Sequence, residues 1–533
     1  MPNHLHYGDN LTVLRDSIAS ESVDLIYLDP PFNSNAGYNV LFKAPDGSGS
    51  AAQIEAFDDT WHWNDSAEAA FADVLRSGNS AAAEMLRAMR GFLGENDMMA
   101  YLAMMDARLI ELHRVLKPTG SLYLHCDPTA SHYLKILLDA VFGKHAFTNE
   151  IVWQRTNTKA HAFTRFSSSH DVILFYRKGE PAIWNAQFLP HSESYIKSHY
   201  GNIEEGTGRQ YTLGDCTNPN PDRPNLNYEW QGVTKVWRWT RERMQQMHDE
   251  GRLVYTKSGA PRFKRYLDEM KGTPISSVWT DIFPINSQAQ ERLGYPTQKP
   301  VALLERILNA SSNPGDVVLD PFCGCGTTVH AAEKLGRQWI GIDVTHLAIG
   351  LIEKRLRDAF PAVQFQTHGV PQDIHAARDL AARGKYHEFE KWALSLIAAQ
   401  PGNFGKKGAD RGLDGRLYFG AKGTTLGIVS VKAGENIGVS MIRDLKGVLD
   451  RERAGVGVFL TLTEPTKPMI AEAASAGLHE EPGFAPVPRL QIVTVEQAMA
   501  LRERAVHLPA RRDDTFKRAA REEAPHRQGA LDL

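Results

Sequence analysis

The chain has 533 residues, which is long for one domain and predicts two or three. Its hydrophobic fraction of 42% and charged fraction of 23% are ordinary for a globular protein. A net charge of −3 excludes a global basic field, so contact with nucleic acid must come from local patches. We find no run of about eighteen apolar residues and no charged-then-apolar amino terminus, so we expect no membrane span or signal peptide. The four scattered cysteines suit a reducing cytoplasm better than a disulfide framework.

The first candidate site residue in chain order is Asp9, in the segment Tyr7-Gly8-Asp9-Asn10. Gly8 suits a turn, and Asp9 is a good cap for the helix expected after it. Asp9 also follows a short strand, where it would face a ligand at the edge of a sheet. The pattern leaves both roles open.

The next feature is an acidic and aromatic turn directly after the apolar strand predicted at 23–28. The turn reads Asp29-Pro30-Pro31-Phe32, and its prolines end the strand because they cannot donate to a sheet. Asp29 and the carbonyl of Pro30 offer two acceptors for an exocyclic amine, and Phe32 offers a flat surface for a planar base. For an isolated turn, an aspartate that only caps the backbone would be the simpler interpretation.

Strands and helices then alternate up to about residue 178. Residues 45–115 are mostly helical in pattern, with breaks near Ser77–Asn79 and at Gly91. Further strands are predicted at 121–125, 151–153 and 171–176, with a helix at 131–142. Helices between strands of this kind predict a doubly wound α/β layer.

From about 179 to 283 the periodicity is poor, and tryptophans and basic residues are interleaved. Lys235 to Arg241 and Arg262 to Arg265 show this most clearly. Basic and aromatic side chains together suit phosphate contact and base stacking, which makes the region a candidate for reading a DNA sequence. A solvated hairpin around a buried tryptophan explains any single stretch equally well.

The α/β pattern resumes with a helix at 301–309 and a strand at 317–319. A glycine-rich loop from Asp320 to Thr328 follows, then a helix at 329–335 and a strand that ends at Asp343. The glycines let the backbone approach a ligand at the helix N-terminus, and Asp343 lies where a carboxylate can accept from two ribose hydroxyls. This arrangement is half of a nucleotide-binding unit.

These motifs together resemble the amino-group DNA methyltransferases that use S-adenosylmethionine. Asp29 to Phe32 match the catalytic motif of that family, and Tyr295 to Pro300 match the segment before its cofactor loop. The order of catalytic motif, variable region and cofactor loop is that of the permuted β group. The positions that match the cofactor loop are Asp320, Phe322, Gly324, Gly326 and Thr327.

The resemblance implies a role for each matched residue. Asp29 and the Pro30 carbonyl would bind the target amine, and Phe32 would stack on the extruded base. Asp343 would hold the ribose of S-adenosylmethionine, with Asp9 near its adenine and Thr297 and Lys299 near its methionine end. No metal is required for methyl transfer.

The resemblance also bears on the substrate and its surroundings. Aspartate at the first motif position is more typical of adenine-N6 enzymes than of cytosine-N4 enzymes, which remain the alternative. The implied partner is double-stranded DNA in the cytoplasm, at the nucleoid. The sequence leaves open a monomer or a homodimer.

The carboxyl-terminal third has an amphipathic helix at 386–399 that contains Glu390, a glycine-rich turn at 408–415 and a strand at 426–431 that ends at Lys432. These elements resemble the Mrr-like restriction endonucleases. Glu390, Asp414 and Lys432 match the positions that build a Mg²⁺ site in that family, with the ion at Asp414. Ser430 departs from it, because a glutamate or glutamine is usual there and serine is a weaker ligand for a hard cation. A DNA-binding or structural domain without metal is therefore the alternative to a nuclease.

The expected fold class is α/β, with a Rossmann-like sheet, an inserted target-recognition region and a restriction-endonuclease-like domain. The methyltransferase would occupy 1–178 and 290–370, and the target-recognition region 179–289. A linker at 371–384, an endonuclease-fold domain at 385–503 and a poorly ordered tail at 504–533 would follow. The alternatives are a bifunctional modification and restriction enzyme, and a DNA-binding protein that keeps only a relic cofactor pocket.

Overall fold

The computed structural model describes most of the chain. The described residues are 3–31, 39–43, 49–55, 62–157, 163–164, 166–286, 289–293, 295, 297–402, 413–511 and 519–522. For 39–43, 49–55 and 347, only the backbone is described. The chain divides into two compact units, one formed by 1–185 with 277–533 and the other by 186–276.

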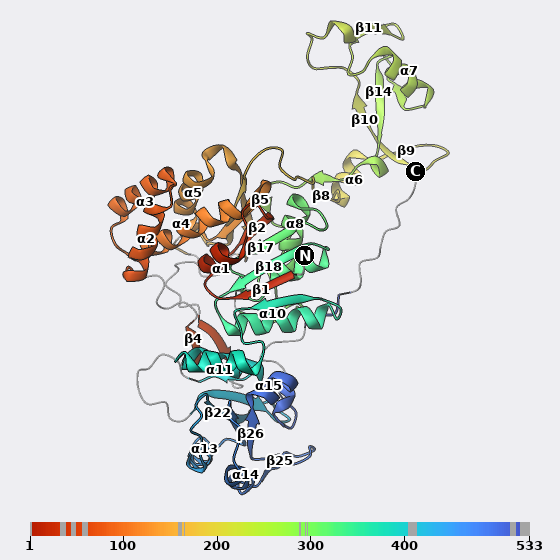
Figure 1. Ribbon diagram of the computed structural model, residues 1–533. Helices are drawn as coiled ribbons and strands as arrows, with labels where there is room; N and C mark the ends of the chain where they lie inside the picture. The colour runs from red at the N-terminus through yellow and green to blue at the C-terminus, as the bar shows by residue number, and fades with distance from the viewer. Residues whose placement is uncertain are drawn as a thin grey trace. The chain divides into compact units, whose positions relative to one another are not determined.

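One mixed sheet organises the amino-terminal part of the larger unit (Figure 1). Within the described residues it has nine strands, in the order β16 (Val278–Trp279), β6 (Phe147–Gln154), β7 (His170–Arg177), β5 (Leu116–Cys126), β2 (Val23–Leu28), β17 (Val317–Asp320), β18 (Gln338–Asp343), β1 (Asn3–Tyr7) and β19 (Phe365–His368). Strand β7 is antiparallel to its two neighbours, and the other pairs are parallel. The order reverses between β2 and β17, which is where ligands bind in sheets of this kind.

Helices connect these strands. They are α1 (Asn10–Ser17), α2 (Asp65–Arg76), α3 (Ser80–Leu93), α4 (Asp97–Val115), α5 (Pro128–Phe142), η1 (Lys144–Ala146), α8 (Val301–Ser311), α9 (Thr327–Lys334) and α10 (His346–Ala359). A separate hairpin pairs β3 (Asn39–Lys43) with β4 (Gly49–Glu55). No helix of the described part of the chain is long and apolar enough to cross a membrane.

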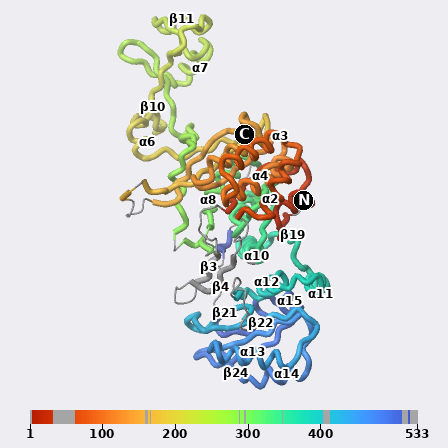
Figure 2. The backbone as a smooth tube through the Cα atoms, turned by 90° about the vertical axis from the view of Figure 1, so that its left-hand side faces the viewer, coloured from red at the N-terminus to blue at the C-terminus, as the bar shows by residue number. Residues whose placement is uncertain are grey.

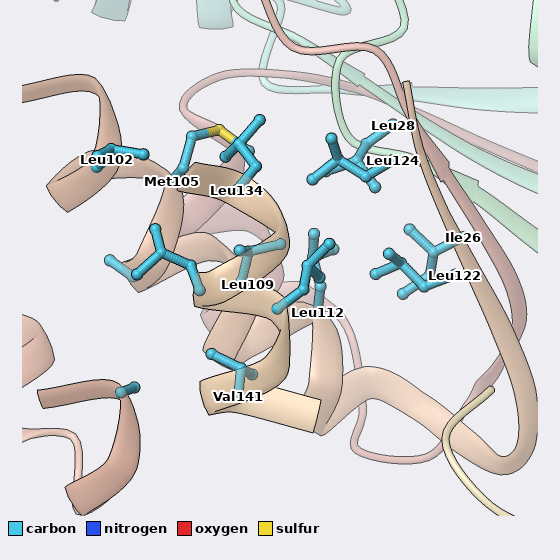
Figure 3. Close-up of a cluster of buried hydrophobic side chains, with 14 of the residues drawn as sticks. Ile26, Leu28, Leu102, Met105, Leu109, Leu112, Leu122, Leu124, Leu134 and Val141 are labelled. Atoms are coloured by element: carbon cyan, nitrogen blue, oxygen red, sulfur yellow. The ribbon is translucent and has the colours of Figure 1, made fainter. Parts of the chain in front are cut away.

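Helices α1, α4 and α5 cover one face of the sheet because each turns an apolar stripe toward it. Figure 3 shows Leu109 and Leu112 of α4 facing Leu122 and Leu124 of β5, with Ile26 of β2 beside them. All five side chains are fully buried. This core fixes the orientation of β2 and β5 within the sheet.

Two expectations for residues 45–115 are wrong. Residues Gly49–Glu55 form strand β4, not helix, because they pair with β3. Helix α3 runs through Gly91 and ends at Leu93, where Gly94 takes a φ of +72° and donates its N–H to Arg90. Burial of Leu86 and Met89 on α3 outweighs the roughly 1 kcal/mol that a helical glycine costs.

The unit of residues 186–276 is built from short strands. Its elements are β8 (Phe188–Leu189), α6 (Glu193–His199), β9 (Asn202–Ile203), β10 (Gln210–Asp215), η2 (Pro224–Leu226), β11 (Asn227–Trp230), β12 (Val233–Val236), α7 (Arg241–Asp249), β13 (Leu253–Tyr255), β14 (Pro261–Tyr266), η3 (Leu267–Glu269) and β15 (Thr273–Pro274). Strands β13, β14, β10 and β9 form its largest sheet, which is antiparallel. Cys216, Trp230 and Trp237 form its core with two methionines of α7.

The carboxyl-terminal domain has a second mixed sheet in the order β20-β21-β22-β23-β26. Its elements are α11 (Ile374–Ala382), α12 (Tyr386–Leu396), β20 (Gln400–Pro401), β21 (Gly415–Phe419), β22 (Thr425–Lys432), α13 (Val439–Arg451), β23 (Val456–Thr461), α14 (Lys467–Ala474), β24 (Leu478–His479), β25 (Val487–Pro488), β26 (Leu490–Thr494), α15 (Val495–Leu501) and η4 (Arg502–Ala505). Figures 1 and 2 show α15 on one side of this sheet and α13 and α14 on the other. Ala377 and Ala381 of α11 join the core on the α12 and α15 side.

Of the predicted tail, the structure describes residues 504–511 and 519–522. In the second of these stretches, the backbone N–H of Glu522 donates to the carbonyl of Ala359 over 3.0 Å, and its carboxylate contacts His330 and Lys334 of α9. These contacts attach Glu522 to the methyltransferase part of the chain.

Candidate active site

The turn after β2 lies at the carboxyl edge of the sheet. All six residues of β2 are buried, and Leu25 and Ile26 pair with Val318 and Leu319 of β17. Asp29 and Asp320 therefore lie at the carboxyl ends of neighbouring parallel strands, at the same edge of the sheet. Pro30 is buried and Pro31 half-buried, while Phe32 lies outside the described residues.

Asp29 is held by a lysine from the other half of the fold. The Nζ of Lys299 lies 2.5 Å from Oδ2 of Asp29, and the side chains are only 13% and 17% exposed. Lys299 precedes helix α8, which begins at Val301. An ion pair that is largely removed from water fixes the carboxylate more firmly than a surface pair would.

The loop after β17 forms its tight bend with two left-handed glycines. Gly324 has a φ of +53° and Gly326 a φ of +75°, in the region that favours glycine. A Cβ on Gly326 would lie 2.8 Å from Cγ1 of Ile352, whereas a Cβ on Gly324 would only touch the ring of Tyr295 at 3.6 Å. Gly326 is thus needed for packing, and Gly324 faces the open side of the loop.

Two carboxylates, those of the buried Asp320 and the half-buried Asp343, accept hydrogen bonds from the backbone of this loop. Oδ1 of Asp320 accepts from the N–H of Phe322 over 3.0 Å, and Oδ2 of Asp343 accepts from the N–H of Gly324 over 2.9 Å. Oδ1 of Asp343 also accepts from the N–H and the hydroxyl of Thr345. Burial raises the pKa of Asp320 to about 7 and that of Asp343 to about 6. The hydrogen bonds to these carboxylates therefore do not fully compensate for the loss of water around the charged form.

Two contacts hold the carboxylate of Asp9, and one of them is the predicted helix cap. Its Oδ1 accepts from the N–H of Thr12 over 3.1 Å and caps α1, while Oδ2 pairs with Arg108 at 2.6 Å. The buried Arg108 also donates to Oδ1 of Asn10, and Nδ2 of Asn10 donates to the carbonyl of Pro321 over 2.7 Å. This chain of contacts ties β1, α4 and the cofactor loop together.

These groups line one cavity of about 220 Å³. Of the predicted site residues, it brings together Asp9, Asp29, Pro30, Pro31, Thr297, Lys299, Asp320, Phe322, Gly324, Thr327 and Asp343. Gly326 is not part of its lining. The catalytic turn and the glycine loop thus flank one pocket, as the sequence order required.

Sequence reasoning missed several lining residues, notably Asn10, Tyr27, Arg108 and Tyr295. Arg108 could have been noticed, because an arginine between the apolar residues of α4 needs a buried partner. Tyr27 is part of a chain of polar contacts behind Asp29. Its hydroxyl lies 2.8 Å from Nδ1 of His125, and Nε2 of His125 lies 3.0 Å from Oδ2 of Asp171.

In the unit of residues 186–276, the aromatic and basic residues separate. Trp230 and Trp237 are buried, and the indole N–H of Trp237 donates to the carbonyl of Tyr228 over 2.8 Å. For these two residues, the interpretation as buried core tryptophans is correct. The exposed members of the predicted segments are Thr240 and the cations Lys235, Arg238, Arg241 and Arg265.

In the carboxyl-terminal domain, two of the three predicted nuclease residues lie together. Oδ2 of Asp414 lies 3.6 Å from Nζ of Lys432 and accepts from the N–H of Val431 over 2.7 Å. The hydroxyl of Ser430 donates to the same oxygen over 3.1 Å. Glu390 is half-buried on α12, a helix that packs against β22.

Comparisons with known proteins agree with this architecture. A family model for a DNA methylase matches residues 23–354, and one for a restriction endonuclease matches 382–479. The Type II methyltransferase M.EcaI of Enterobacter cloacae is 30% identical over 67% of this chain and 69% of its own. The DNA adenine methyltransferase YhdJ of Escherichia coli is 26% identical over 66% of this chain and 81% of its own. Among solved structures, the cytosine-N4-specific PvuII DNA methyltransferase aligns over 73% of this chain and 93% of its own, at 13% identity and a TM-score of 0.32.

A Rossmann-like sheet with an acidic-proline turn and a glycine loop around one cavity defines a methyltransferase that depends on S-adenosylmethionine. The chain belongs to the N6/N4 DNA methylase family and carries a restriction-endonuclease domain after it. The predicted class, fold and activity on DNA are confirmed.

Proposed function

We propose that this chain methylates the N6 amine of adenine in double-stranded DNA. The observation that carries the proposal is the shared cavity of Asp29 and the glycine loop after β17. Aspartate as the first residue of the catalytic motif favours adenine over cytosine. The relative YhdJ, named as an adenine methyltransferase, supports the same choice.

The cavity suits S-adenosylmethionine by its charge. Its lining carries the carboxylates of Asp9, Asp29, Asp320 and Asp343 against the cations Arg108 and Lys299. A net negative lining fits a ligand with a cationic sulfur and an ammonium group. When bound, S-adenosylmethionine supplies an activated methyl group.

Different residues of the cavity lining hold different parts of S-adenosylmethionine in this proposal. Asp343 accepts from the ribose, and one further acceptor position on its Oδ2 is left beside the N–H of Gly324. Asp9 lies at the adenine end, and Thr297 and Lys299 lie at the methionine end. The left-handed Gly324 keeps the backbone close to the ligand, since no side chain stands between them.

Asp29 and the carbonyl of Pro30 orient the target amine. Oδ2 of Asp29 faces Lys299, so Oδ1 can accept a hydrogen from the amine and turn its lone pair toward the methyl group. Asp29 also offers an acceptor for the proton that the amine loses. Catalysis is then mainly alignment, with Phe32 stacking on a base extruded at a cost of a few kcal/mol.

The target sequence would be read by the unit of residues 186–276. Its exposed cations Lys235, Arg238, Arg241 and Arg265 suit the phosphate backbone. A DNA substrate would place the enzyme at the nucleoid.

The test uses Asp29→Asn, with Asp16→Asn on the exposed side of α1 as its matched control. Purified proteins are incubated with labelled S-adenosylmethionine and duplex DNA, and the methylated nucleosides are identified by mass spectrometry. We expect N6-methyladenine from the wild type and the control, and loss of transfer with retained cofactor binding for Asp29→Asn. Undiminished transfer by this variant would reject the mechanism, and N4-methylcytosine as the product would reject the adenine assignment.

A second proposed function is Mg²⁺-dependent DNA cleavage by the carboxyl-terminal domain. Asp414, directly before β21, and Lys432, the last residue of β22, are adjacent and supply one carboxylate ligand and a cation for the scissile phosphate. Ser430 contributes a neutral hydroxyl where a second charged ligand would bind Mg²⁺ more tightly. We therefore expect weak cleavage.

This second function is tested on unmethylated DNA with Mg²⁺. Ser430→Glu should raise cleavage and Asp414→Asn should abolish it, while Asp444→Asn on the exposed side of α13 should change nothing. Intact DNA with both the wild type and Ser430→Glu would show that the domain does not cut.

A further inference from the structure

Three histidines meet at one edge of the large sheet, in strands that the methyl transfer does not use. His4 and His6 lie in β1, and His368 is the last residue of β19. These strands are parallel and in register, with His6 opposite His368. Because side chains alternate along a strand, His4 and His6 share one face of β1, and Leu5 and Tyr7 point to the other.

The opposite face of β1 is already occupied. Leu5 is fully buried, and the ring of Tyr7 stacks on His346 at the start of α10 with a centroid distance of 3.8 Å. The histidine face is more open, since all three imidazoles are half-buried. An ion could therefore reach them without disturbing the core.

The rings are close enough to share one ion. Nδ1 of His4 lies 3.0 Å from Nε2 of His368, and the rings of His6 and His368 stack with centroids 4.5 Å apart. One ring nitrogen from each histidine lies within 4.8 Å of the other two. A simple hydrogen-bonded pair would explain His4 and His368, but it gives no reason for the third ring.

The ligand type indicates which metals the cluster would hold. A neutral imidazole presents a free lone pair to a metal ion. Neutral imidazoles suit Zn²⁺, Ni²⁺ and Cu²⁺, whereas Mg²⁺ and Ca²⁺ prefer oxygen ligands.

We propose that His4, His6 and His368 bind one divalent transition-metal ion, with Zn²⁺ as the principal candidate, which joins strand β1 to strand β19. Three protein ligands on two strands leave a fourth position for water. The site is separate from methyl transfer, and its proposed role is structural.

The position of the site explains what such an ion would stabilise. Strand β1 ends at Tyr7, directly before Gly8 and Asp9, which line the cofactor cavity. Beyond His368, Gly369 has a φ of +79°, and a Cβ there would lie 2.1 Å from the carbonyl oxygen of Tyr7. The two strands thus run together up to the cavity wall, and an ion at the histidines would hold them in this register.

The test begins with full-length protein freed of metal by chelation and then dialysed against Zn²⁺. The protein carries Asp414→Asn, which removes the proposed Mg²⁺ site, and we expect it to bind one Zn²⁺ per chain. We also expect a higher unfolding temperature with Zn²⁺ than with Mg²⁺. His6→Gln and His368→Gln should weaken binding by more than the roughly 10- to 100-fold typical of changes outside the ligand shell. His132→Gln, an exposed histidine on α5, is the matched control and should bind like the wild type.

Folding of each variant is checked by its S-adenosylmethionine binding, and His4→Gln replaces any variant that does not fold. Co²⁺ bound to the wild type gives a second readout, because nitrogen ligation produces visible bands without the charge-transfer band of a thiolate. No Zn²⁺ binding, equal binding by the histidine variants, or a thiolate band would each overturn the site. Loss of methyl transfer alone would not bear on it, so the two proposals fail independently.

Discussion

Lys299 and Asp29 form an ion pair although they lie 270 positions apart in the chain. Asp29 belongs to the segment before the unit of residues 186–276, and Lys299 to the segment after it. The pair therefore joins two parts of the methyltransferase that are far apart in the sequence. It places a positive charge beside the carboxylate that orients the amine in the proposed mechanism.

The first prediction concerns this pair. Lys299→Gln removes the positive charge and leaves Asp29 largely buried without its partner, so the carboxylate loses its fixed orientation. We expect kcat of methyl transfer to fall on the order of 100-fold, the size of effect seen when one preorganised donor is lost. Lys299→Arg keeps the charge and should retain more activity.

Steady-state methylation of duplex DNA, together with calorimetric binding of S-adenosylmethionine, checks this prediction. Lys354 of α10 pairs with Asp358 in the next turn, and Lys354→Gln serves as the control. If Lys299→Gln weakened cofactor binding but left kcat unchanged, the lysine would serve the cofactor alone.

The second prediction concerns the glycine loop. Gly326→Ala forces a left-handed φ on a residue with a side chain, at a cost of about 1–2 kcal/mol, and places its Cβ 2.8 Å from Ile352. We expect a lower unfolding temperature and weaker S-adenosylmethionine binding, because the loop must shift. Gly350→Ala is the matched control, since that helical glycine has open space around its Cβ and the change should stabilise by about 0.5–1 kcal/mol. Equal behaviour of the two variants would contradict the role given to Gly326.

Much of the site was predictable because its residues stand at the ends of strands. Asp29, Asp320 and Asp343 each follow an apolar run, and parallel strands bring such ends to one edge. Arg108 was not predictable in this way, since its partners Asp9 and Asn10 are about a hundred positions away and nothing in the pattern of α4 indicates them.

The errors in the predicted fold have the same physical origin as the missed Arg108, namely contacts between residues that are distant in the sequence. The segment Gly49–Glu55 is rich in residues that tolerate a helix, but strand pairing with Asn39–Lys43 depends on contacts that local preference does not register. For the tryptophans of the 186–276 unit the sequence left base stacking and burial equally open, because composition does not report burial; Trp237 is fully buried.

The third prediction follows from the raised pKa of Asp320, which is about 7 because the carboxyl is buried. A cationic ligand in the cavity favours the ionised form, so S-adenosylmethionine binding should lower this pKa and release protons between about pH 6 and 7. Calorimetry in buffers of different ionisation enthalpy measures the release. Asp320→Asn should reduce it, whereas Asp16→Asn should leave it unchanged. Equal proton release by the wild type and Asp320→Asn would show that the carboxyl does not respond to the ligand.

The last prediction concerns Asp106, which is fully buried on α4. Neither of its carboxylate oxygens has a hydrogen-bond partner among the described residues, and burial raises its pKa to about 7. The folded protein holds this proton more tightly than the unfolded chain does, whose carboxyl titrates near 3.8. Stability from this group is therefore complete below pH 3.8 and is lost as the pH rises toward about 7, above which folding must bury a charge.

Asp106→Asn removes this dependence, because the amide is neutral at every pH and nearly the same size. We expect the variant to unfold about 2 to 6 °C above the wild type at pH 8 and within about 1 °C of it at pH 4. Asp320 and Asp343 titrate in both proteins, so their contribution cancels in the difference between the two melting curves. Thermal unfolding followed by circular dichroism from pH 4 to pH 8 measures that difference. A constant offset over the whole range would mean that folding does not raise the pKa of Asp106, because the gap widens only between the pKa of the unfolded chain and that of the folded protein.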